Sequence, residues 1–287
     1  MPRQAYVNGR YVPHREAAVH IEDRGYQFAD GVYEVVPVYN GILVDEDLHL
    51  DRLDRSLSEL RIDEPMSRPA LKLISRELMR RNGLSNGFLY MQVTRGVAPR
   101  DHKFPKNVKP AVVMTTRQTK PHSKQLLEEG LKVITVADQR WDRCDIKSVS
   151  LLPNILGKQA AVEAGAYEAW QVDKDGLVTE GTSTNAWIVT QDNKVVTRDA
   201  THSILGGITR HTLLALIRNE GYDLEERAFS VEEAKEAKEA FLTSSTSLVL
   251  PITELDGQPI GNGHPGILTG KLRQVYIDYM QSLKQSA

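Results

Sequence analysis

The chain lacks the features that would mark a secreted, membrane-bound or nucleic-acid-binding protein. Its 287 residues include one cysteine, Cys144, which cannot form an internal disulfide bond. No apolar run could span a bilayer, and Met1–His14 contains no apolar stretch typical of a secretory signal. The 36 Lys and Arg residues balance 38 Asp and Glu residues, which argues against binding of nucleic acid or membranes by bulk charge. We therefore expect a soluble cytoplasmic protein.

The first half of the chain is patterned as hairpins, helices and two longer strands. Asn-Gly pairs between strand-forming residues predict tight hairpin turns, and leucines at helical spacing follow the second pair. Pro37 falls inside an apparent strand, which implies an edge or a bulge there. A proline-rich stretch predicts a loop that carries Arg100 and His102. The expected elements are hairpins over 5–12 and 38–44, helices over 48–60 and 67–83, and strands over 88–94 and 111–116.

The second half also mixes strands with helices, so both halves are predicted to be α+β. The natural break falls between Lys120 and Leu131, and we place the domains at residues 1–122 and 123–287. The expected elements are strands over 131–136, 167–172, 177–179, 186–189 and 194–197, and helices over 154–164, 209–219 and 268–283.

Lys147 is the first candidate for chemistry. It follows a predicted strand and precedes the apolar residues Val149 and Leu152. A lysine taken alone is most simply a solvated side chain. Apolar neighbours, however, would desolvate its ammonium group and lower its pKa. An amine that is neutral near pH 7 can form a Schiff base and later carry a proton.

Glu180 is the second candidate. It ends a short apolar strand and is followed by a glycine and the hydroxyl residues Thr182, Ser183 and Thr184. Such a string is most simply a turn between strands. A carboxylate held at a strand end could also keep a heteroaromatic nitrogen protonated. The hydroxyl groups would then orient polar substituents nearby.

Three further features would suit a phosphate group. Two glycines precede a predicted helix, so the backbone amides of Ile208 and Thr209 would face an anion at its positive end. Hydroxyl residues gather at 243–247, and Arg52 could add a charge-assisted contact. Each feature has a plain structural alternative, namely a helix cap, a loop and a surface arginine.

Taken together, these residues resemble the fold-type-IV pyridoxal-phosphate enzymes, which include D-amino-acid and branched-chain aminotransferases and aminodeoxychorismate lyase. The likeness follows the order and spacing of the motifs over essentially the whole chain. Two markers in the first half make the D-amino-acid aminotransferases the most similar branch. The motifs that carry the resemblance lie at 23–28, 30–35, 94–96, 100–102, 144–148, 179–181, 207–210 and 243–245.

The resemblance implies a role for each candidate residue. Lys147 would be the Schiff-base lysine for pyridoxal 5′-phosphate, and Glu180 would face the pyridine nitrogen. Tyr33, Arg100 and His102 would bind the α-carboxylate of the substrate. The remaining cofactor contacts would be Leu205 against the ring and, around the phosphate, Arg52, Ile208, Thr209, Ser244 and Ser245.

The resemblance also implies an architecture and an activity. A small N-terminal α/β domain, 1–122, would precede a larger mixed-sheet, pseudo-barrel domain, 123–287, that carries Lys147. The enzyme would transfer nitrogen from a D-amino acid such as D-alanine to a 2-oxo acid such as 2-oxoglutarate, giving pyruvate and D-glutamate. In this family Arg100 and His102 would reach the neighbouring active site, so a homodimer is implied. No metal, nucleic acid or membrane partner is expected.

Three alternative functions remain open. A branched-chain L-aminotransferase would use the same cofactor residues, although the pair Arg100 and His102 speaks against it. A lyase of the aminodeoxychorismate type would eliminate pyruvate instead of transferring nitrogen. A non-catalytic phosphate-binding or scaffold protein would keep the fold alone, but the presence of both Lys147 and Glu180 argues against this.

Other assignments of the histidines and the cysteine are weaker. His102 has no partner at metal-ligand spacing, and Cys144 has no base nearby in the sequence, which favours a small buried core residue. His49 and His211 lie on predicted helices and are expected at the surface or in an interface.

Overall fold

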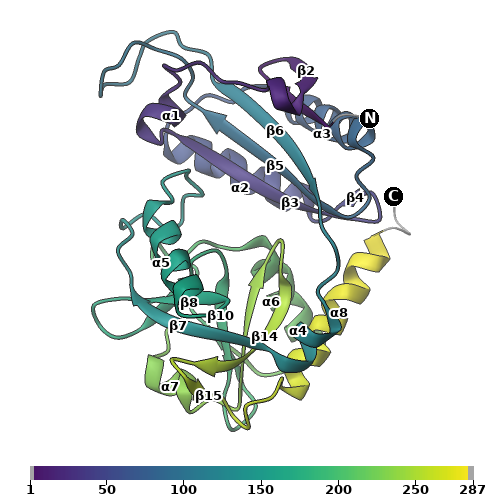
Figure 1. Cartoon of the computed structure of the whole chain (residues 1–287), viewed down its shortest axis with the longest axis vertical. Helices are drawn as coiled ribbons and strands as arrows, with labels where there is room; N and C mark the ends of the chain where they lie inside the picture. Colours follow the sequence, from purple (N-terminus) through teal and green to yellow (C-terminus); the bar gives the residue numbers. More distant parts are fainter. Residues whose placement is uncertain (1–2, 284–287) are drawn as a thin grey trace. The chain divides into compact units, whose positions relative to one another are not determined.

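The computed structural model describes residues 3–283, which form two compact units (Figure 1). The first unit comprises residues 3–120 together with Ile146–Ser150, and the second comprises Pro121–Asp145 and residues 151–283. Each unit combines helices with one sheet, so the predicted α+β class is confirmed. Over the described residues, no helix has the length and apolar character needed to cross a membrane.

The first unit contains a six-stranded antiparallel sheet in the order β2-β1-β6-β5-β3-β4. Both predicted hairpin turns are present, with Asn8 and Asn40 in the left-handed region that such turns require. The elements are β1 (Gln4–Val7), β2 (Arg10–Pro13), a 3-10 turn (His14–Glu16), α1 (Arg24–Phe28), β3 (Gly31–Tyr39), β4 (Ile42–Leu43), α2 (Glu46–Glu59), α3 (Arg68–Asn82), β5 (Gly87–Thr94) and β6 (Ala111–Gln118).

Pro37 lies within β3 without a shift in register. β3 pairs with β5 along its length, including Pro37 opposite Phe88, but β4 pairs only with Val38 and Tyr39 on the other side. The pairing with β4 begins only after Pro37, so the proline lies at a local edge of the sheet, as predicted.

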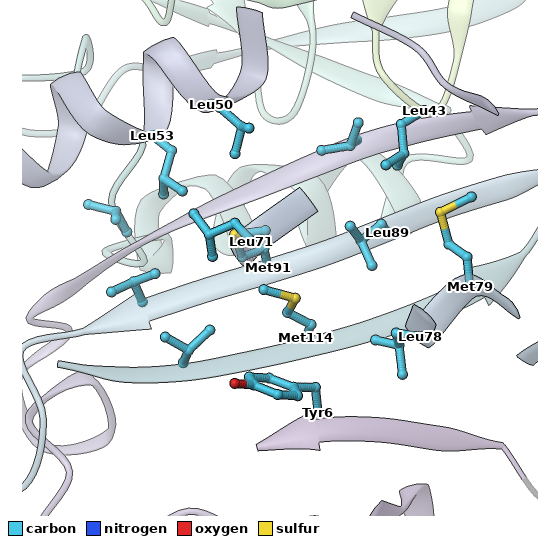
Figure 2. Packing of buried hydrophobic residues seen from close by; sticks show 14 of the residues in the cluster. Tyr6, Leu43, Leu50, Leu53, Leu71, Leu78, Met79, Leu89, Met91 and Met114 are labelled. Atoms are coloured by element: carbon cyan, nitrogen blue, oxygen red, sulfur yellow. The ribbon is translucent and has the colours of Figure 1, made fainter. Parts of the chain in front are cut away.

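Helices α2 and α3 cover one face of this sheet and bury its core (Figure 2). Leu50 and Leu53 of α2 and Leu78 of α3 meet side chains of the strands such as Met91 and Met114. Strand side chains alternate between the two faces of a sheet. The strand residues that alternate with this core therefore point to the opposite face. That second face carries Tyr33, Val35, Tyr90 and Gln92, which are half-buried.

The segment Ile146–Ser150 packs with the first unit, whereas the sequence assigned it to the C-terminal domain. Tyr33 donates a backbone hydrogen bond of 3.0 Å to the Lys147 carbonyl, and Val149 donates one of 3.0 Å to Gly31. Ile146 is buried in the first core. The segment therefore pairs with β3 near Val32, on the side away from β5, and this backbone pairing explains why it belongs to the first unit.

The second unit contains a nine-stranded mixed sheet whose main path is β12-β11-β10-β13-β14-β7-β8-β9. The elements are α4 (Lys124–Glu129), β7 (Leu131–Ala137), α5 (Leu152–Glu163), β8 (Glu168–Val172), β9 (Val178–Gly181), β10 (Asn185–Val189), β11 (Val195–Thr197), α6 (Ile208–Asn219), β12 (Leu224–Glu226), α7 (Val231–Lys235), β13 (Glu239–Ser244), β14 (Leu248–Leu255), β15 (Gln258–Pro259) and α8 (Ile267–Ser282).

This second sheet curls until β9 approaches β10, although four strands separate them along the sheet order. Its interior is a core built around Trp170 and Phe229, whose rings meet edge to face at 5.9 Å. Helices α6 and α8 pack on β13, and α5 packs on β7 and β8. The curl agrees with the predicted pseudo-barrel and brings the end of β9, with Glu180, close to the start of β10.

Candidate active site

Lys147 lies beside an aromatic face of the first unit. Its Nζ atom is 4.2 Å from the centroid of the Tyr33 ring, a distance at which an ammonium group is attracted to the ring. Its backbone N–H donates to the buried Ser56 hydroxyl of α2 at 3.3 Å. Leu152, one of the apolar residues expected around the amine, belongs to the second unit and is 67% exposed. The position of the amine is thus set by Tyr33 and by backbone bonds.

Tyr33 itself is held by a neighbouring aromatic residue. Its ring centroid lies 5.7 Å from that of Tyr90, and the Tyr90 hydroxyl donates to Gln92 at 2.7 Å. Burial, with the neighbouring Tyr33, raises the pKa of Tyr90 to about 12, so this hydroxyl stays protonated at neutral pH. These residues form a polar and aromatic surface that contacts Lys147 through Tyr33.

Arg52 is not a surface arginine. Its Nε and Nη2 atoms each donate a 2.8 Å hydrogen bond to Glu34, and His49 Nδ1 lies 2.6 Å from the same carboxylate. His49 is 1% exposed, so the expectation that it lies at the surface or in an interface is wrong. Glu34 draws both side chains inward because a buried carboxylate needs donors.

Arg100 and His102 share one aromatic neighbour. The Arg100 guanidinium carbon lies 4.5 Å from the centroid of the Phe28 ring, and the His102 ring lies 5.4 Å from it. Over residues 3–283, no hydrogen bond or ring contact joins either side chain to Tyr33. The structure thus brings together two of the three residues predicted to bind the substrate carboxylate.

In the second unit, Glu180 is the last residue but one of β9 and accepts hydrogen bonds from several donors. Arg140 donates to Oε1, the Leu205 backbone N–H donates to the same oxygen at 3.1 Å, and the Asn185 amide donates to Oε2 at 3.0 Å. Donors of this kind stabilise a negatively charged carboxylate. Glu180 can therefore accept a hydrogen bond from a protonated ring nitrogen.

Arg140 connects Glu180 to a second carboxylate, that of Asp138. The sequence motifs did not identify this arginine as a site residue. Its Nε and Nη2 atoms donate to Asp138 at 2.9 and 2.7 Å. Burial raises the pKa of Asp138, but the bonds from Arg140 outweigh it and leave that pKa below its usual value. The pairs with Asp138 and Glu180 raise the pKa of Arg140 despite burial, so it stays charged.

The three hydroxyl residues after Glu180 are hydrogen-bonded to a buried carboxylate. Thr182, Ser183 and Thr184 all donate to Glu168, a carboxylate with no exposed surface, at 2.5, 3.2 and 3.2 Å. Their expected role in orienting substituents is thus replaced by a structural one. They fix the turn between Glu180 and Asn185.

The start of α6 fits an anion. The first helical bond runs from His211 to the Gly207 carbonyl, so the amides of Ile208 and Thr209 precede the hydrogen-bonded turns. The Thr209 hydroxyl is buried and has no hydrogen-bond partner among the described residues. An orphaned donor is costly to bury, and a phosphate oxygen at this helix start would satisfy it.

The other predicted phosphate and ring contacts lie in the same unit. Ser244 and Ser245 are half-buried at the end of β13, where the Ser244 hydroxyl accepts a 3.0 Å bond from the Ser247 amide. Leu205 is half-buried and adjoins Glu180 through its backbone. Ile208 is buried at the first turn of α6.

The comparisons with known proteins identify the family. Residues 31–255 match the amino-transferase class IV family. The chain belongs to the class IV aminotransferases, and the predicted family is confirmed. It is 48% identical over 263 residues to a D-alanine aminotransferase from Bacillus licheniformis, covering 91% of this chain and 92% of that one. It is 39% identical over 280 residues to a D-alanine aminotransferase from Staphylococcus haemolyticus, covering 97% and 98%.

Solved structures of this fold include branched-chain amino acid aminotransferases. The enzyme from Escherichia coli superposes with a TM-score of 0.90 at 22% identity, covering 97% of this chain and 94% of that one. A second branched-chain amino acid aminotransferase, solved with pyridoxamine 5′-phosphate, gives a TM-score of 0.91 at 24% identity, with the same coverage. These likenesses confirm the fold.

Proposed function

We propose that this chain is a pyridoxal 5′-phosphate-dependent D-amino-acid aminotransferase that converts D-alanine and 2-oxoglutarate into pyruvate and D-glutamate. The observation that carries the proposal is that a class IV aminotransferase contains both a lysine beside an aromatic ring, Lys147, and a carboxylate held by several donors, Glu180. Its similarity to D-alanine aminotransferases over nearly the whole chain supports the choice of substrate. A cytoplasmic location fits such an enzyme.

The residues of the chain fit the cofactor on chemical grounds. The buried, unpartnered Thr209 hydroxyl and the α6 amides suit a phosphate. Glu180 suits a protonated pyridine nitrogen, because the bonds from Arg140, Asn185 and Leu205 favour its ionised form. Lys147 supplies the amine that binds the cofactor aldehyde covalently. We propose that these residues, with Arg52, Leu205, Ser244 and Ser245, act on one cofactor molecule.

Each of these groups then has a defined task. When bound, pyridoxal phosphate supplies an electron sink for the negative charge that develops at the substrate Cα atom. Lys147 would accept the substrate Cα proton at Nζ and would act as the acid and base that moves it during transamination. Glu180 holds the proton on the ring nitrogen, and Arg140 holds Glu180 in place. Tyr33 packs against Lys147 Nζ and limits its movement.

Arg100 and His102 would select the enantiomer. Lys147 Nζ would take the proton from one side of the bound substrate. Only a substrate whose Cα–H bond points to that side would therefore react. Binding the α-carboxylate at Arg100 and His102 fixes which hand presents its hydrogen there. The branched-chain L-aminotransferase is the main alternative, and a lyase would use the same amine without transferring nitrogen.

A homodimer completes the proposal. In the single chain, α5 exposes Leu152, Ile155 and Leu156, whose side chains are 67%, 59% and 56% exposed. A cluster of large apolar side chains at the surface is typical of an interaction site. By its resemblance to the family, we propose that Arg100 and His102 of each subunit reach the active site of the other. Light scattering of the purified protein should give twice the mass of one chain.

The deciding experiment supplies D-alanine with 2-oxoglutarate and follows pyruvate and the chirality of the glutamate. D-Alanine turnover with D-glutamate as product is expected, and L-leucine should be a poor substrate. Turnover of L-leucine alone would favour the branched-chain alternative, and pyruvate formed without glutamate would favour a lyase.

The residue assignment needs a separate test. Borohydride reduction followed by peptide mapping should place the cofactor on Lys147. Lys147→Ala should lose this label, and its turnover should fall at least about a thousandfold. The control variant Lys271→Ala changes an exposed lysine and should keep both the label and the turnover of the wild type. A label on any other lysine contradicts the assignment.

A further inference from the structure

The motif Asp23–Phe28 has no part in the chemistry described so far, yet it holds a buried arginine. The Arg24 side chain is 4% exposed, and its Nε atom donates to Asp30 at 2.8 Å. Its Nη1 atom donates to the backbone carbonyl of Asp101 at 2.6 Å. Asp101 lies between Arg100 and His102 in the sequence, and all three residues are exposed. Arg24 therefore holds the backbone of the loop between the two residues proposed to bind substrate.

Phe28 brings the same groups together. The guanidinium carbon of Arg24 lies 4.8 Å from the Phe28 ring centroid, compared with 4.5 Å for Arg100. The His102 ring lies 5.4 Å from Phe28. One aromatic ring therefore contacts the buried arginine and both exposed residues, which limits how far the loop can move relative to α1.

The anchor of Arg24 is itself fixed. Asp30 accepts bonds of 2.8 and 3.0 Å from Arg95, which also donates to the carbonyls of Leu60 and Arg61 at the end of α2. Burial raises the pKa of Asp30, but Arg95 and Arg24 lower it further than burial raises it. Asp30 therefore keeps a charged partner, Arg95, even when Arg24 is replaced.

The backbone around Arg24 leaves little freedom. Its N–H donates to the Gly96 carbonyl at 2.9 Å. A Cβ atom at Gly25 would lie 2.2 Å from Cγ2 of Thr94, so only glycine permits this approach of α1 to β5. Asp23 accepts bonds from the Gly25 amide and the Thr94 hydroxyl. The backbone of Arg24 is thus fixed, and its guanidinium group is held within hydrogen-bonding distance of the Asp101 carbonyl.

We propose that Arg24 is a positioning residue that fixes the loop carrying Arg100 and His102, and through it the orientation of the substrate carboxylate. The second half of this inference rests on the proposed function, whereas the tethering of the loop does not. The experiment therefore has one readout that needs no catalysis.

The first readout is trypsin cleavage of the holoenzyme after Arg100 and Lys103, followed by mass spectrometry. Loss of a hydrogen bond from a charged group favours local opening, so Arg24→Met should be cleaved about tenfold faster or more than wild type. The matched control is Arg227→Met, since Arg227 also binds carboxylates, Glu225 and Glu233, and one carbonyl. Cleavage of this control should match wild type.

The second readout is a kinetic cycle with D-alanine. Arg24→Met should raise KM about tenfold and change kcat by less than about twofold. The reason is that the bound substrate and the transition state would lose the same binding free energy. Because Arg24 acts in part through Arg100, the double variant Arg24→Met/Arg100→Ala should lose less kcat/KM than the product of the two single losses.

Unchanged cleavage in Arg24→Met, or losses that multiply in the double variant, would overturn the proposal. If Arg24→Met does not fold, Arg24→Lys keeps the buried charge near Asp30 without spanning to Asp101, and the same outcomes apply to it. A wild-type protein without D-alanine turnover would overturn the proposed function and the substrate half of this inference. Faster cleavage would still establish the tether.

Discussion

Glu34 and Arg52 form a bidentate ion pair in which each carboxylate oxygen accepts a 2.8 Å hydrogen bond from the guanidinium group. Glu34 is 1% exposed, and burial alone would raise the pKa of its carboxyl group. The bonds from Arg52 and His49 outweigh burial and lower the pKa of Glu34 to about 2. This pair fixes the arginine proposed to bind the cofactor phosphate.

The Glu34 pair predicts a pH dependence of stability. A lowered pKa in the folded state gives stability that is present above the ordinary value of 4.5 and is lost as the pH falls through about 2. The shift corresponds to roughly 3 kcal/mol, about 2 kcal/mol of which is lost by pH 3. In urea denaturation, the stability difference between wild type and Glu34→Gln should narrow by this amount between pH 6 and pH 3.

Glu77 provides the control for this measurement. Its bonds to Arg80 and Arg81 lower the pKa of Glu77 to about 2 as well, but they lie on the surface of α3. Solvent screens such pairs, so Glu77→Gln should show no comparable change with pH. Equal behaviour of the two variants would contradict the role of burial.

Arg140 should be essential to the stability of the second unit. Its side chain is 6% exposed, and Arg140→Met would leave the carboxylates of Asp138 and Glu180 buried without their cation. A broken buried pair costs about 3–5 kcal/mol, which urea denaturation of the holoenzyme would show. The control Arg143→Met removes an arginine that is 34% exposed and should cost less. A loss under about 1 kcal/mol in Arg140→Met would refute this expectation.

Arg100 should contribute directly to substrate binding. If it donates a charge-assisted bond to the α-carboxylate, Arg100→Ala should lower kcat/KM for D-alanine about ten- to a hundredfold, or roughly 1.5–3 kcal/mol. Lys106→Ala changes another exposed cation of the same loop and should leave kcat/KM unchanged. Unaltered D-alanine kinetics in Arg100→Ala would remove Arg100 from the site.

Cys144 should be unreactive in the folded protein. Its Sγ atom donates to the Trp141 carbonyl, and burial together with nearby carboxylates raises the pKa of the thiol to about 12 despite Arg140. Since the thiolate is the reactive form, a thiol reagent at pH 8 should label the native chain slowly and the urea-unfolded chain at once. Rapid labelling of the native chain would show that this thiol is activated.

The sequence predicted most of the longer elements because their signals are local, but it missed the central strand β14 (Leu248–Leu255). The Asn-Gly turns, the helix leucines and the alternating strands each lie within a few neighbouring residues. Lys147 and Glu180 could be singled out for the same reason, since each lies in a short contiguous motif. Arg140 could not, because it lies 40 residues before its partner Glu180 and has no local pattern.

His49 shows why burial is harder to predict than an element. A histidine on a helix is compatible with either environment, and only the contact with Glu34, 15 residues earlier, decides it. A usable signal was present in β3, where Glu34 lies between Val32 and Val36 on the core face. A carboxylate in such a pattern requires buried donors. The packing of Ile146–Ser150 on β3 had no comparable signal, because edge pairing depends on the path of the whole chain.

That edge pairing constrains how related enzymes can be recombined. A fragment that stops at Lys120 would lack Ile146–Ser150, the peptide that runs along β3 and carries Lys147. In a chimera that joins the first half of one relative to the second half of another, the β3 edge and the incoming peptide would come from different parents. The candidate nucleophile would then be seated on a foreign strand, so a crossover point that looks harmless in the linker could disable the hybrid.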